Sequence, residues 1–501
     1  MASANSEPPY DVIIIGAGIS GINAAYRLQT RLPNYRFVIL EARDRIAGTW
    51  SFWKYPGVRS DSAMGVFTFG WAPWPHNNNM ADADVIASYI EHAAASQGID
   101  KKILLHHCLK SSSWDSDEQA WTLSVDVSAE DGSKQAKEFK TRWVISCAGY
   151  YDYENPLPAE IPGIDNFRGE VVHPQFWNDD ITYAGKKIII IGSGATAVTL
   201  LPALAKTAAS VTMLQRSPSY VLPLPGKEGI LIFLRKWLPE RWALLLTWWK
   251  NMIQETFFVW LVTTYPNFGR KLVTARMKTL LPKDFVDKHF NPRYNVFEQR
   301  LCFCPEGDFF DALHQDNCGV VTDTIKTVTE TGILTTSGQT LEADMIVTAT
   351  GLLLKFSSGM PMQVDGVAID KVVHQRYIWN GAMMEGVPNQ GAIIGYTAGT
   401  WTPGADARAC MLIKVMQHME KSGATSATPF IDPEQRKTFP AKPPLTNSST
   451  YIVQALERLP LVADIGPWRN GKRWISDMYR LLLGNVTDGM VYNKPIKVKD
   501  V

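Results

Sequence analysis

Two Gly-rich turns set between apolar strands constrain the fold of this 501-residue chain more than any other feature. The first segment, Asp11 to Gln29 (DVIIIGAGISGINAAYRLQ), is closed by the strand-like run Phe37 to Glu41. The second, Lys186 to Lys206 (KKIIIIGSGATAVTLLPALAK), is closed by Ser210 to Arg216. Each has a continuous β-branched run, a Gly-rich turn and a helical stretch, which is typical of parallel strands covered on both faces. We therefore predict an α/β fold with two Rossmann-like dinucleotide-binding domains.

The first turn has the pattern Gly16-x-Gly18-x-x-Gly21. The first Gly allows a tight turn, the second lets a pyrophosphate approach the backbone, and the third lets the helix pack on the strand. Ser20 lies in the same turn, and the pyrophosphate would bind at the helix N-terminus, where free N–H groups favour an anion. Glu41 follows Gly21 by twenty residues, so its carboxylate can accept from ribose hydroxyls. The turn is predicted to bind a dinucleotide with a free ribose.

The second turn has the same form but is followed by a cation instead of a carboxylate. Arg216 and Ser217 end the next strand, and a guanidinium can hold a 2′-phosphate through two hydrogen bonds. This turn is therefore predicted to bind NADP, although Arg216 could also be a surface cation. The candidate NADP residues here are Gly192, Ser193, Gly194, Ala195, Thr196, Ala197, Arg216 and Ser217.

Two such sites in one chain indicate an electron relay in which NADPH reduces FAD at the first site. A disulfide reductase would need a cysteine pair beside the flavin, but Ala42 to Asp61 contains no cysteine. The six cysteines of the chain form no C-x-x-C pair, which favours a reduced, intracellular protein. No metal site is predicted. The reduced flavin is expected to pass its electrons to a bound acceptor or to oxygen.

Two further motifs resemble those of the type I Baeyer–Villiger monooxygenases, which are class B flavoprotein monooxygenases. The first is F-x-G-x-x-x-H-x-x-x-W, met by Phe167, Gly169, His173 and Trp177, with Asn178 where the family usually has Pro or Asp. The second is [AG]-G-x-W-x-x-x-x-[FY]-P-G-x-x-x-D, met by Ala47, Gly48, Trp50, Tyr55, Pro56, Gly57 and Asp61. With the two turns and the Ala-Thr-Gly at 349–351, the resemblance covers most of the chain.

The resemblance implies an active-site arginine at Arg300, in the run QRLCFCPEGDFFDAL, with Asp61 orienting it. A C4a-peroxyflavin must stay an anion to attack a ketone, and the adduct is also an oxyanion, so a permanent cation stabilises both. From the residues alone, Arg300 could equally be a surface or ion-paired arginine. Many members carry Lys before this arginine, and Gln299 here weakens the expected preference for NADPH without reversing it. Further candidates are Thr49, Trp50, Asp61 and Leu109 for FAD and Arg59 and Ser60 for NADP.

The implied activity is an FAD-dependent, NADPH-consuming Baeyer–Villiger oxidation of a small hydrophobic ketone by molecular oxygen. The Gln-Arg-Leu-Cys run at 299–302 also resembles the subgroup of thioamide-prodrug-activating monooxygenases. Oxygenation of sulfur or nitrogen, as in sulfides or thioamides, is therefore the alternative. A non-catalytic flavin-binding or redox-sensing protein is a third hypothesis, which the combination of Asp61, Arg300 and both turns disfavours.

The order of the motifs predicts how the domains are divided. Residues 1–152 and 350–501 are expected to form a split FAD-binding domain, and residues 153–222 and 301–349 the NADP-binding domain inserted in it. Residues 223–300 are expected to form a helical insert. The substrate would lie where the domains meet, in a largely apolar pocket. The motif from Phe167 to Trp177 is interpreted as an interdomain latch, with the two aromatic residues as packing anchors and His173 as a hydrogen-bonding tie.

The region from Gly229 to Pro282 carries five Trp residues among Leu and Phe, interrupted by charges. Two interpretations are open: an amphipathic insert packed on the core, or an interfacial face or greasy substrate entrance. No secretory signal and no uncharged run of membrane-spanning length is seen. A net charge of +1 gives no electrostatic case for nucleic acid. We expect a cytoplasmic protein, with peripheral membrane association through 229–282 as the alternative.

Overall fold

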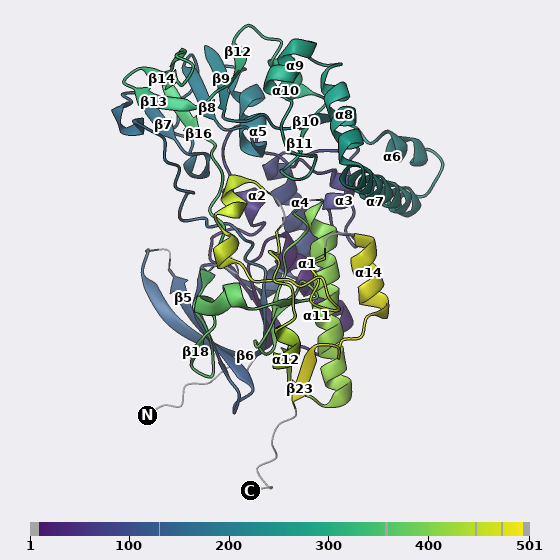
Figure 1. Cartoon of the computed structure of the whole chain (residues 1–501). Coiled ribbons are helices and arrows are strands. Elements are labelled where there is room, and N and C mark those ends of the chain that lie inside the picture. Colours follow the sequence, from purple (N-terminus) through teal and green to yellow (C-terminus); the bar gives the residue numbers. More distant parts are fainter. Residues whose placement is uncertain are drawn as a thin grey trace.

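The computed structural model describes residues 10–129, 131–355, 359–397, 399–445, 448–471 and 474–493. Residues 1–9 lie outside these ranges. The described chain forms two α/β units, the first below and the second above in the view of Figure 1, with a long helical arm at their side. The mixed α/β class with parallel strands and a helical insert is confirmed.

The first unit is built on a nine-stranded sheet in the order β18-β17-β4-β5-β6-β1-β2-β3, with β21 also paired to β6. Strands β1, β2, β3, β6 and β21 run parallel, whereas β4, β5 and β6 form an antiparallel meander. The strands are β1 (Tyr10–Ile15), β2 (Phe37–Leu40), β3 (Ile103–Leu104), β4 (His107–Asp115), β5 (Ala120–Ser128), β6 (Lys134–Ser146), β17 (Met362–Val364), β18 (Val367–Ala368) and β21 (Gln390–Ala392).

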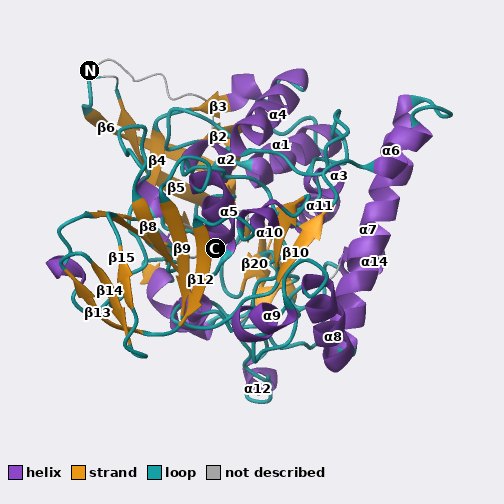
Figure 2. Cartoon of the chain, turned by 90° about the horizontal axis from the view of Figure 1, so that it is seen from above, coloured by secondary structure: helices purple, strands orange, loops and turns teal. Residues whose placement is uncertain are grey.

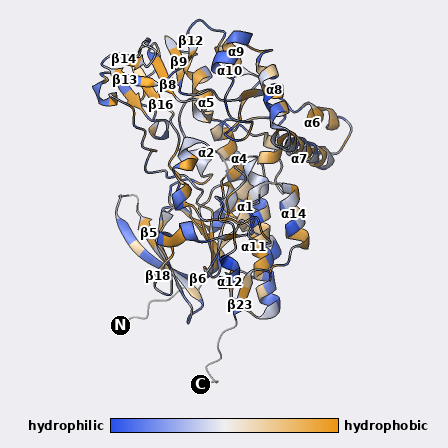
Figure 3. Cartoon of the chain, in the orientation of Figure 1, coloured by the Kyte–Doolittle hydropathy of each residue, from blue (hydrophilic) through white to orange (hydrophobic). Residues whose placement is uncertain are grey.

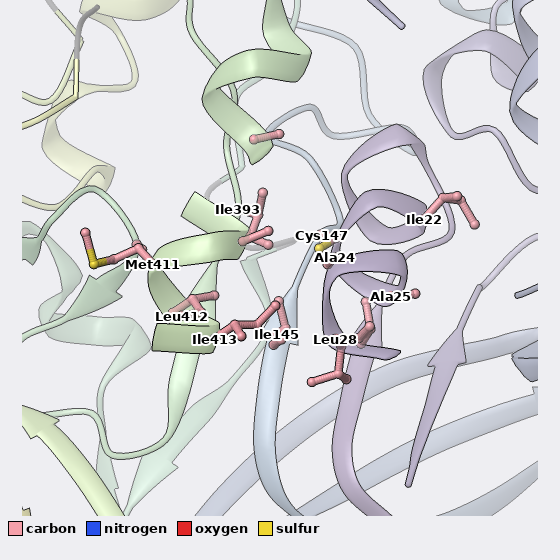
Figure 4. Packing of buried hydrophobic residues seen from close by; sticks show 14 of the residues in the cluster. Ile22, Ala24, Ala25, Leu28, Ile145, Cys147, Ile393, Met411, Leu412 and Ile413 are labelled. Carbon is pink, nitrogen blue, oxygen red and sulfur yellow. The ribbon is translucent and has the colours of Figure 1, made fainter. Parts of the chain in front are cut away.

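Helices α1 (Ile19–Arg31) and α11 (Trp401–Ser422) pack together against this sheet. Figure 4 shows Leu28 of α1 and Leu412 of α11 on opposite sides of Ile145 of β6, in one apolar cluster. The remaining helices of the first unit are α2 (Thr49–Phe52), α3 (Met64–Phe67), α4 (Ala83–Ser96), α12 (Pro433–Arg436), α13 (Thr450–Val453) and α14 (Trp474–Leu483). Helix α13 ends at Val453, and only a 3-10 turn, Leu456–Arg458, follows it.

The second unit has a five-stranded sheet in the order β12-β9-β8-β16-β7, and all its pairs are parallel. Figure 3 colours β8, β9 and β16 as hydrophobic, as expected for strands covered on both faces. The strands are β7 (Glu170–Val172), β8 (Lys187–Ile191), β9 (Ser210–Gln215), β12 (Cys318–Thr322) and β16 (Met345–Thr348), and α5 (Ala195–Leu204) connects β8 to β9. Four smaller sheets are also formed by the described residues. One has three strands, β13 (Ile325–Thr329), β14 (Gly332–Thr335) and β15 (Thr340–Glu342). The others are pairs: β10 (Val221–Leu224) with β11 (Cys302–Pro305), β19 (Ile378–Trp379) with β20 (Met383–Met384), and β22 (Ser426–Pro429) with β23 (Met490–Asn493).

The helical insert lies between β10 and β11 and consists of α6 (Gly229–Leu234), α7 (Glu240–Thr264), α8 (Pro266–Met277) and α9 (Lys283–His289); α10 (Asp308–Ala312) follows β11. Seen from above in Figure 2, α6, α7 and α8 form one straight edge of the molecule. Within the described ranges, none of the helices combines the length and hydropathy needed to cross a membrane.

The motif from Phe167 to Trp177 forms the edge strand β7 and the 3-10 turn Pro174–Phe176 that follows it. Phe167 and Trp177 are buried in the apolar clusters on the two sides of the second sheet. Gly169 is required because a Cβ there would lie 2.4 Å from the Asp344 carbonyl oxygen. The motif therefore anchors the edge of the second sheet.

Truncation of Trp177 to alanine is expected to lower the free energy of unfolding by about 3–5 kcal/mol, the usual cost of removing a buried aromatic side chain. Its neighbour Phe176 is a matched control, because it is 48% exposed whereas Trp177 is 7% exposed. Phe176→Ala should cost roughly 1 kcal/mol or less. Thermal unfolding followed by circular dichroism measures both variants, and equal losses would show that Trp177 is no anchor.

Two antiparallel connecting segments join the units. The Asp152 N–H donates to the Leu353 carbonyl at 2.9 Å, and the Lys355 N–H donates to the Tyr150 carbonyl at 2.9 Å. The Gln175 side-chain amide, which is buried, donates to the Asp152 carbonyl at 3.0 Å. Gln175 is thus the residue of the motif whose side chain hydrogen-bonds to the segments that connect the two units.

Candidate functional site

One cavity of about 1530 Å³ lies where the two units and the insert meet. Its wall includes the first Gly-rich turn, the first residues of α5, the run from Gln299 to Phe303 and one side of α7. A pocket for a single small ligand measures roughly 300–1,000 Å³, so this cavity has room for more than one ligand. The candidate residues that line it are Gly16, Gly18, Ser20, Glu41, Thr49, Trp50, Arg59, Ser60, Asp61, Leu109, Ala195, Thr196 and Arg300.

The first turn adopts the close-packed geometry that its glycines allow. Gly16 has φ +96°, and a Cβ there would lie 2.8 Å from the Cys147 carbonyl oxygen. A Cβ on Gly21 would lie 1.9 Å from the Gly16 carbonyl oxygen, so the start of α1 packs directly on the turn. Near Gly18 the closest atom to a Cβ is the Gly48 Cα at 3.5 Å, which leaves the backbone of Gly18 accessible from the cavity.

Glu41 holds this turn from the end of β2. Its Oε2 accepts from the Ala17 N–H at 2.8 Å, and its Oε1 accepts from the Arg43 N–H at 3.1 Å. The residue is 6% exposed and borders the cavity. A carboxylate oxygen can accept more than one hydrogen bond, so Glu41 can position the turn and also accept from a ribose hydroxyl.

Arg300 and Asp61 form an ion pair in the cavity wall, although they are 239 residues apart in sequence. The Arg300 Nε and Nη2 donate to Asp61 Oδ2 at 2.9 and 2.5 Å. The Asp61 carboxylate is the main reason that the pKa of the Arg300 guanidinium lies well above its ordinary value. Arg300 is therefore a permanent cation with a fixed orientation, and its other N–H groups can donate to an anion.

Two partly buried tyrosines, Tyr150 and Tyr151, lie near this pair. The hydroxyls of Tyr150 and Tyr151 are 2.9 Å apart, and the Tyr150 ring is stacked on Trp401 with centroids 5.4 Å apart. Burial raises the pKa of the Tyr151 phenol well above its ordinary value, although Arg300 opposes the shift. Both hydroxyls are therefore protonated near neutral pH and can donate hydrogen bonds toward the cavity that they line.

The second resemblance motif, from Ala47 to Asp61, brings the first unit against the second Gly-rich turn. A Cβ on Gly57 would lie 2.9 Å from the Ala203 Cβ and 3.1 Å from the Thr199 carbonyl oxygen, so this Gly allows close contact with α5. Tyr55 is partly buried beside Thr196, and loss of solvent contact there raises the pKa of Tyr55 to about 12. The motif thus contributes to the interface between the two nucleotide turns.

The structure places the candidate NADP residues in two groups. Arg59, Ser60, Ala195 and Thr196 line the cavity, whereas Gly192, Ser193, Gly194, Ala197, Arg216 and Ser217 do not. Arg216 is exposed, and its Nη2 donates to Thr450 Oγ1 at 3.2 Å. Ser193 Oγ lies 3.3 Å from the Ser217 carbonyl oxygen, so the turn and the end of β9 are adjacent. Arg59 forms an ion pair with Asp308, 2.7 Å from Nη1 to Oδ2, and Ser60 is buried.

Replacement of Arg216 by alanine is expected to raise the KM for NADPH about tenfold, because one exposed charge-assisted hydrogen bond is lost. The KM for NADH should stay unchanged, since NADH has no 2′-phosphate. Arg168→Ala is the matched control, because Arg168 is a 75% exposed arginine of the same unit, paired with Glu330. Steady-state kinetics with both cofactors measure the effect, and a parallel rise for NADH would contradict a role in holding the 2′-phosphate.

Several residues of the site had no signal in the sequence. Trp401 Nε1 donates to Ser20 Oγ at 2.9 Å, and Thr49 Oγ1 lies 3.1 Å from the Tyr153 hydroxyl. Glu255 of α7 accepts from the Thr400 N–H and hydroxyl, both at 2.7 Å, and so ties the insert to the loop before α11. Asp308 alone could have been suspected, because it follows Arg300 by eight residues in the same quoted run.

His173 lies outside the cavity wall. Its Nδ1 accepts from the Gln175 N–H at 3.2 Å, within its own turn, and burial lowers its pKa. The hydrogen bond expected from His173 is therefore made within its own turn and does not reach the other unit. The lowered pKa keeps the ring neutral near pH 7.

The wall suits a flavin dinucleotide beside a nicotinamide dinucleotide. The backbone of Gly18 and the N-terminus of α1 face one part of the cavity, and Ala195 and Thr196 at the start of α5 face another. Both helix N-termini have a glycine N-cap in extended conformation with no side-chain cap, which leaves N–H donors for a pyrophosphate. Apolar groups such as Trp50 and Leu109 offer contact area for flat ring systems.

Comparison with known proteins extends over nearly the whole chain. The profile of the FMO-like family, described as flavin-binding monooxygenase-like, matches residues 10–427. The FAD-containing monooxygenase EthA of Mycolicibacterium smegmatis is 40% identical over 471 residues, which cover 94% of each protein.

Two solved structures resemble the fold. An oxidized steroid monooxygenase bound to NADP superposes with a TM-score of 0.74 at 19% identity, covering 97% of this chain and 100% of the other. An open form of cyclohexanone monooxygenase superposes with a TM-score of 0.72 at 18% identity, with the same coverage. At these identities the likeness shows a shared fold.

Proposed function

The chain belongs to the flavin-binding monooxygenase-like family, and from this premise we propose that it is a Baeyer–Villiger monooxygenase, which converts ketones to esters or lactones. It is a flavin-containing, NADPH-dependent monooxygenase with FAD and NADP as cofactors. The proposed Baeyer–Villiger reaction is supported above all by one observation: the Arg300–Asp61 pair in the wall of the cavity that joins both nucleotide turns.

When bound, FAD reduced by NADPH supplies the activated oxygen. We propose that Gly16, Gly18, Ser20, Gly21, Glu41, Thr49, Trp50, Asp61 and Leu109 hold FAD. The proposed NADP residues are Arg59, Ser60, Gly192, Ser193, Gly194, Ala195, Thr196, Ala197, Arg216 and Ser217. The domain boundaries at residues 152, 222, 300 and 349 belong to the same proposal, which fits the return of β17, β18 and β21 to the first sheet.

Arg300 would stabilise the negative charge that develops on the substrate during the reaction. Addition of oxygen to a ketone carbonyl places negative charge on the carbonyl oxygen, and a fixed guanidinium stabilises that charge without donating its proton away. Asp61 positions the guanidinium by accepting from Nε and Nη2, so that Nη1 and the second Nη2 hydrogen remain for substrate. His173, outside the wall and uncharged, would act as neither acid nor base.

Oxygenation of sulfur or nitrogen is the second candidate. One observation favours it: the residue beside Arg300 is the neutral Gln299, in the run 299–302 that resembles the thioamide-activating subgroup. A sulfide attacks oxygen as a nucleophile and forms no oxyanion on its own carbon. Sulfur oxygenation would therefore depend less on Arg300.

The two candidates are separated by substrate. The enzyme with FAD and NADPH is offered a panel of hydrophobic ketones and, separately, matched sulfides, and the products are identified by mass spectrometry. The proposal predicts esters or lactones from ketones. Products from the sulfides alone would replace it with the second candidate.

A further inference from the structure

We propose that the helical insert, together with α14, forms a docking surface for an anionic lipid bilayer. This inference does not depend on whether the oxygenated atom is carbon, sulfur or nitrogen. It develops the peripheral membrane association that the sequence left open as an alternative, by naming the face, the residues and the lipid charge.

The surface consists of an apolar stripe along α7. Its residues follow the i, i+3, i+4 spacing of one helix face, and each is between 38% and 62% exposed: Trp242, Leu246, Trp249, Ile253, Phe257 and Trp260. A surface helix of a globular protein ordinarily presents polar residues on this side. The stripe runs along almost the whole length of this 25-residue helix. It therefore forms one contiguous exposed apolar patch, unlike the singly scattered apolar residues that are normal on protein surfaces.

Neighbouring helices extend the stripe into a face, called here the apolar face. On α6 and just after it, Phe233 and Trp237 are 60% and 75% exposed. On α14, Tyr479, Leu482 and Leu483 are 65% to 70% exposed. The Trp474 ring of α14 contacts the rings of Trp248 and Trp249, with centroids 5.5 and 5.4 Å apart, so α14 continues the surface of α7. Figures 1 and 2 show α6, α7 and α14 on the same side of the molecule.

Positive charge accompanies the apolar face. Residues 229–282 carry eight Lys and Arg against two Glu, although the whole chain has a net charge of only +1. Exposed Lys236 and Arg241 lie at the α6–α7 end, and exposed Lys271 and Arg276 lie on α8 at the other end. Cations beside exposed Trp, Phe and Leu match the headgroup region of an anionic bilayer. A second copy of the chain would bring the same positive charge against itself, which disfavours self-association through this face.

The opposite side of α7 faces the cavity. Asn251, Gln254 and Phe258 line it, and Ile230 of α6 both lines it and is 45% exposed. The cavity therefore reaches the edge of the apolar face. Docking would place the cavity beside the bilayer, where hydrophobic substrates accumulate.

The test uses the full-length holoenzyme and sedimented vesicles of phosphatidylcholine, with or without phosphatidylglycerol. The wild type is expected to sediment with the anionic vesicles, less with neutral ones, and less at high salt because screening weakens the charge term. The double variant Ile253→Glu/Phe257→Glu should lose on the order of a hundredfold in binding, since each charge opposes insertion by roughly a factor of ten. Bound flavin and thermal stability are checked for every variant.

Val367→Glu is the matched control, because Val367 is 57% exposed, like Phe257, but lies on β18 in the first sheet. It should bind vesicles as the wild type does. Failure of the wild type to sediment with anionic vesicles would overturn the proposal, as would equal losses in the control and the stripe variant. Light scattering that shows a wild-type dimer dissociated by the stripe variant, without vesicle binding, would replace the bilayer with a second copy of the chain.

Discussion

Replacement of Arg300 by alanine is expected to reduce ester formation from ketones by on the order of a hundred- to thousandfold, the usual cost of removing one donor to a developing oxyanion. The rate at which NADPH reduces the flavin should stay close to that of the wild type, because that step places no negative charge on the substrate. Stopped-flow absorbance measures reduction, and product analysis measures ester.

Two companion variants sharpen this result. Arg300→Lys keeps the charge but loses the planar fork that donates to Asp61 through two nitrogens, so it should recover only part of the activity. Asp61→Asn should leave the guanidinium present but poorly oriented, with ester formation impaired and flavin reduction retained. Full ester formation by Arg300→Ala would remove Arg300 from the proposed role.

Replacement of Gly21 by alanine is expected to lower FAD occupancy more than about tenfold, because overpacking of a tight site costs roughly 1–3 kcal/mol or more. The added Cβ would lie 1.9 Å from the Gly16 carbonyl oxygen, so the turn and α1 must separate. The ratio of flavin absorbance to protein in the purified variant measures the loss, and far-UV circular dichroism reports whether the rest of the fold is retained.

Gly194→Ala is the matched control in the second turn. No atom lies within 4 Å of a Cβ built there, so the turn itself should tolerate the methyl group. FAD occupancy should equal that of the wild type, and any effect should fall on NADPH. An equal loss of flavin in both variants would show that the close contact at Gly21 is not the cause.

The parts of the fold that are local in sequence were predictable. The strands expected at 37–41, 187–191 and 210–216 are observed as Phe37–Leu40, Lys187–Ile191 and Ser210–Gln215. Continuous apolar runs and Gly-rich turns carry this information within some thirty residues. The helical nature of 229–282 was predictable from its local alternation of apolar and charged residues, but the face of α7 that stays exposed depends on what α3 and the cavity cover.

The candidate site was predictable only in part, because its contacts join distant segments. The contact between Arg300 and Asp61 was expected from family resemblance and could not be derived from spacing. The bonds from Trp401 to Ser20 and from Glu255 to Thr400 cross 381 and 145 residues and follow from the packing of α11 and α7. The motif suggested that His173 makes a hydrogen bond between the domains. The bond to the connecting segment is instead donated by the buried side-chain amide of Gln175 to the Asp152 carbonyl.

In the proposed reaction, one oxygen atom is inserted beside a ketone carbonyl. The most direct measurement is a single turnover of the NADPH-reduced enzyme with a hydrophobic ketone and ¹⁸O-labelled oxygen gas, followed by mass spectrometry of the product. We expect an ester or lactone that carries one labelled atom, located in the bridging position, and very little of this product from Arg300→Ala. A reduced flavin that consumes oxygen but leaves the whole ketone panel unlabelled, while the matched sulfides gain one labelled atom, would contradict it.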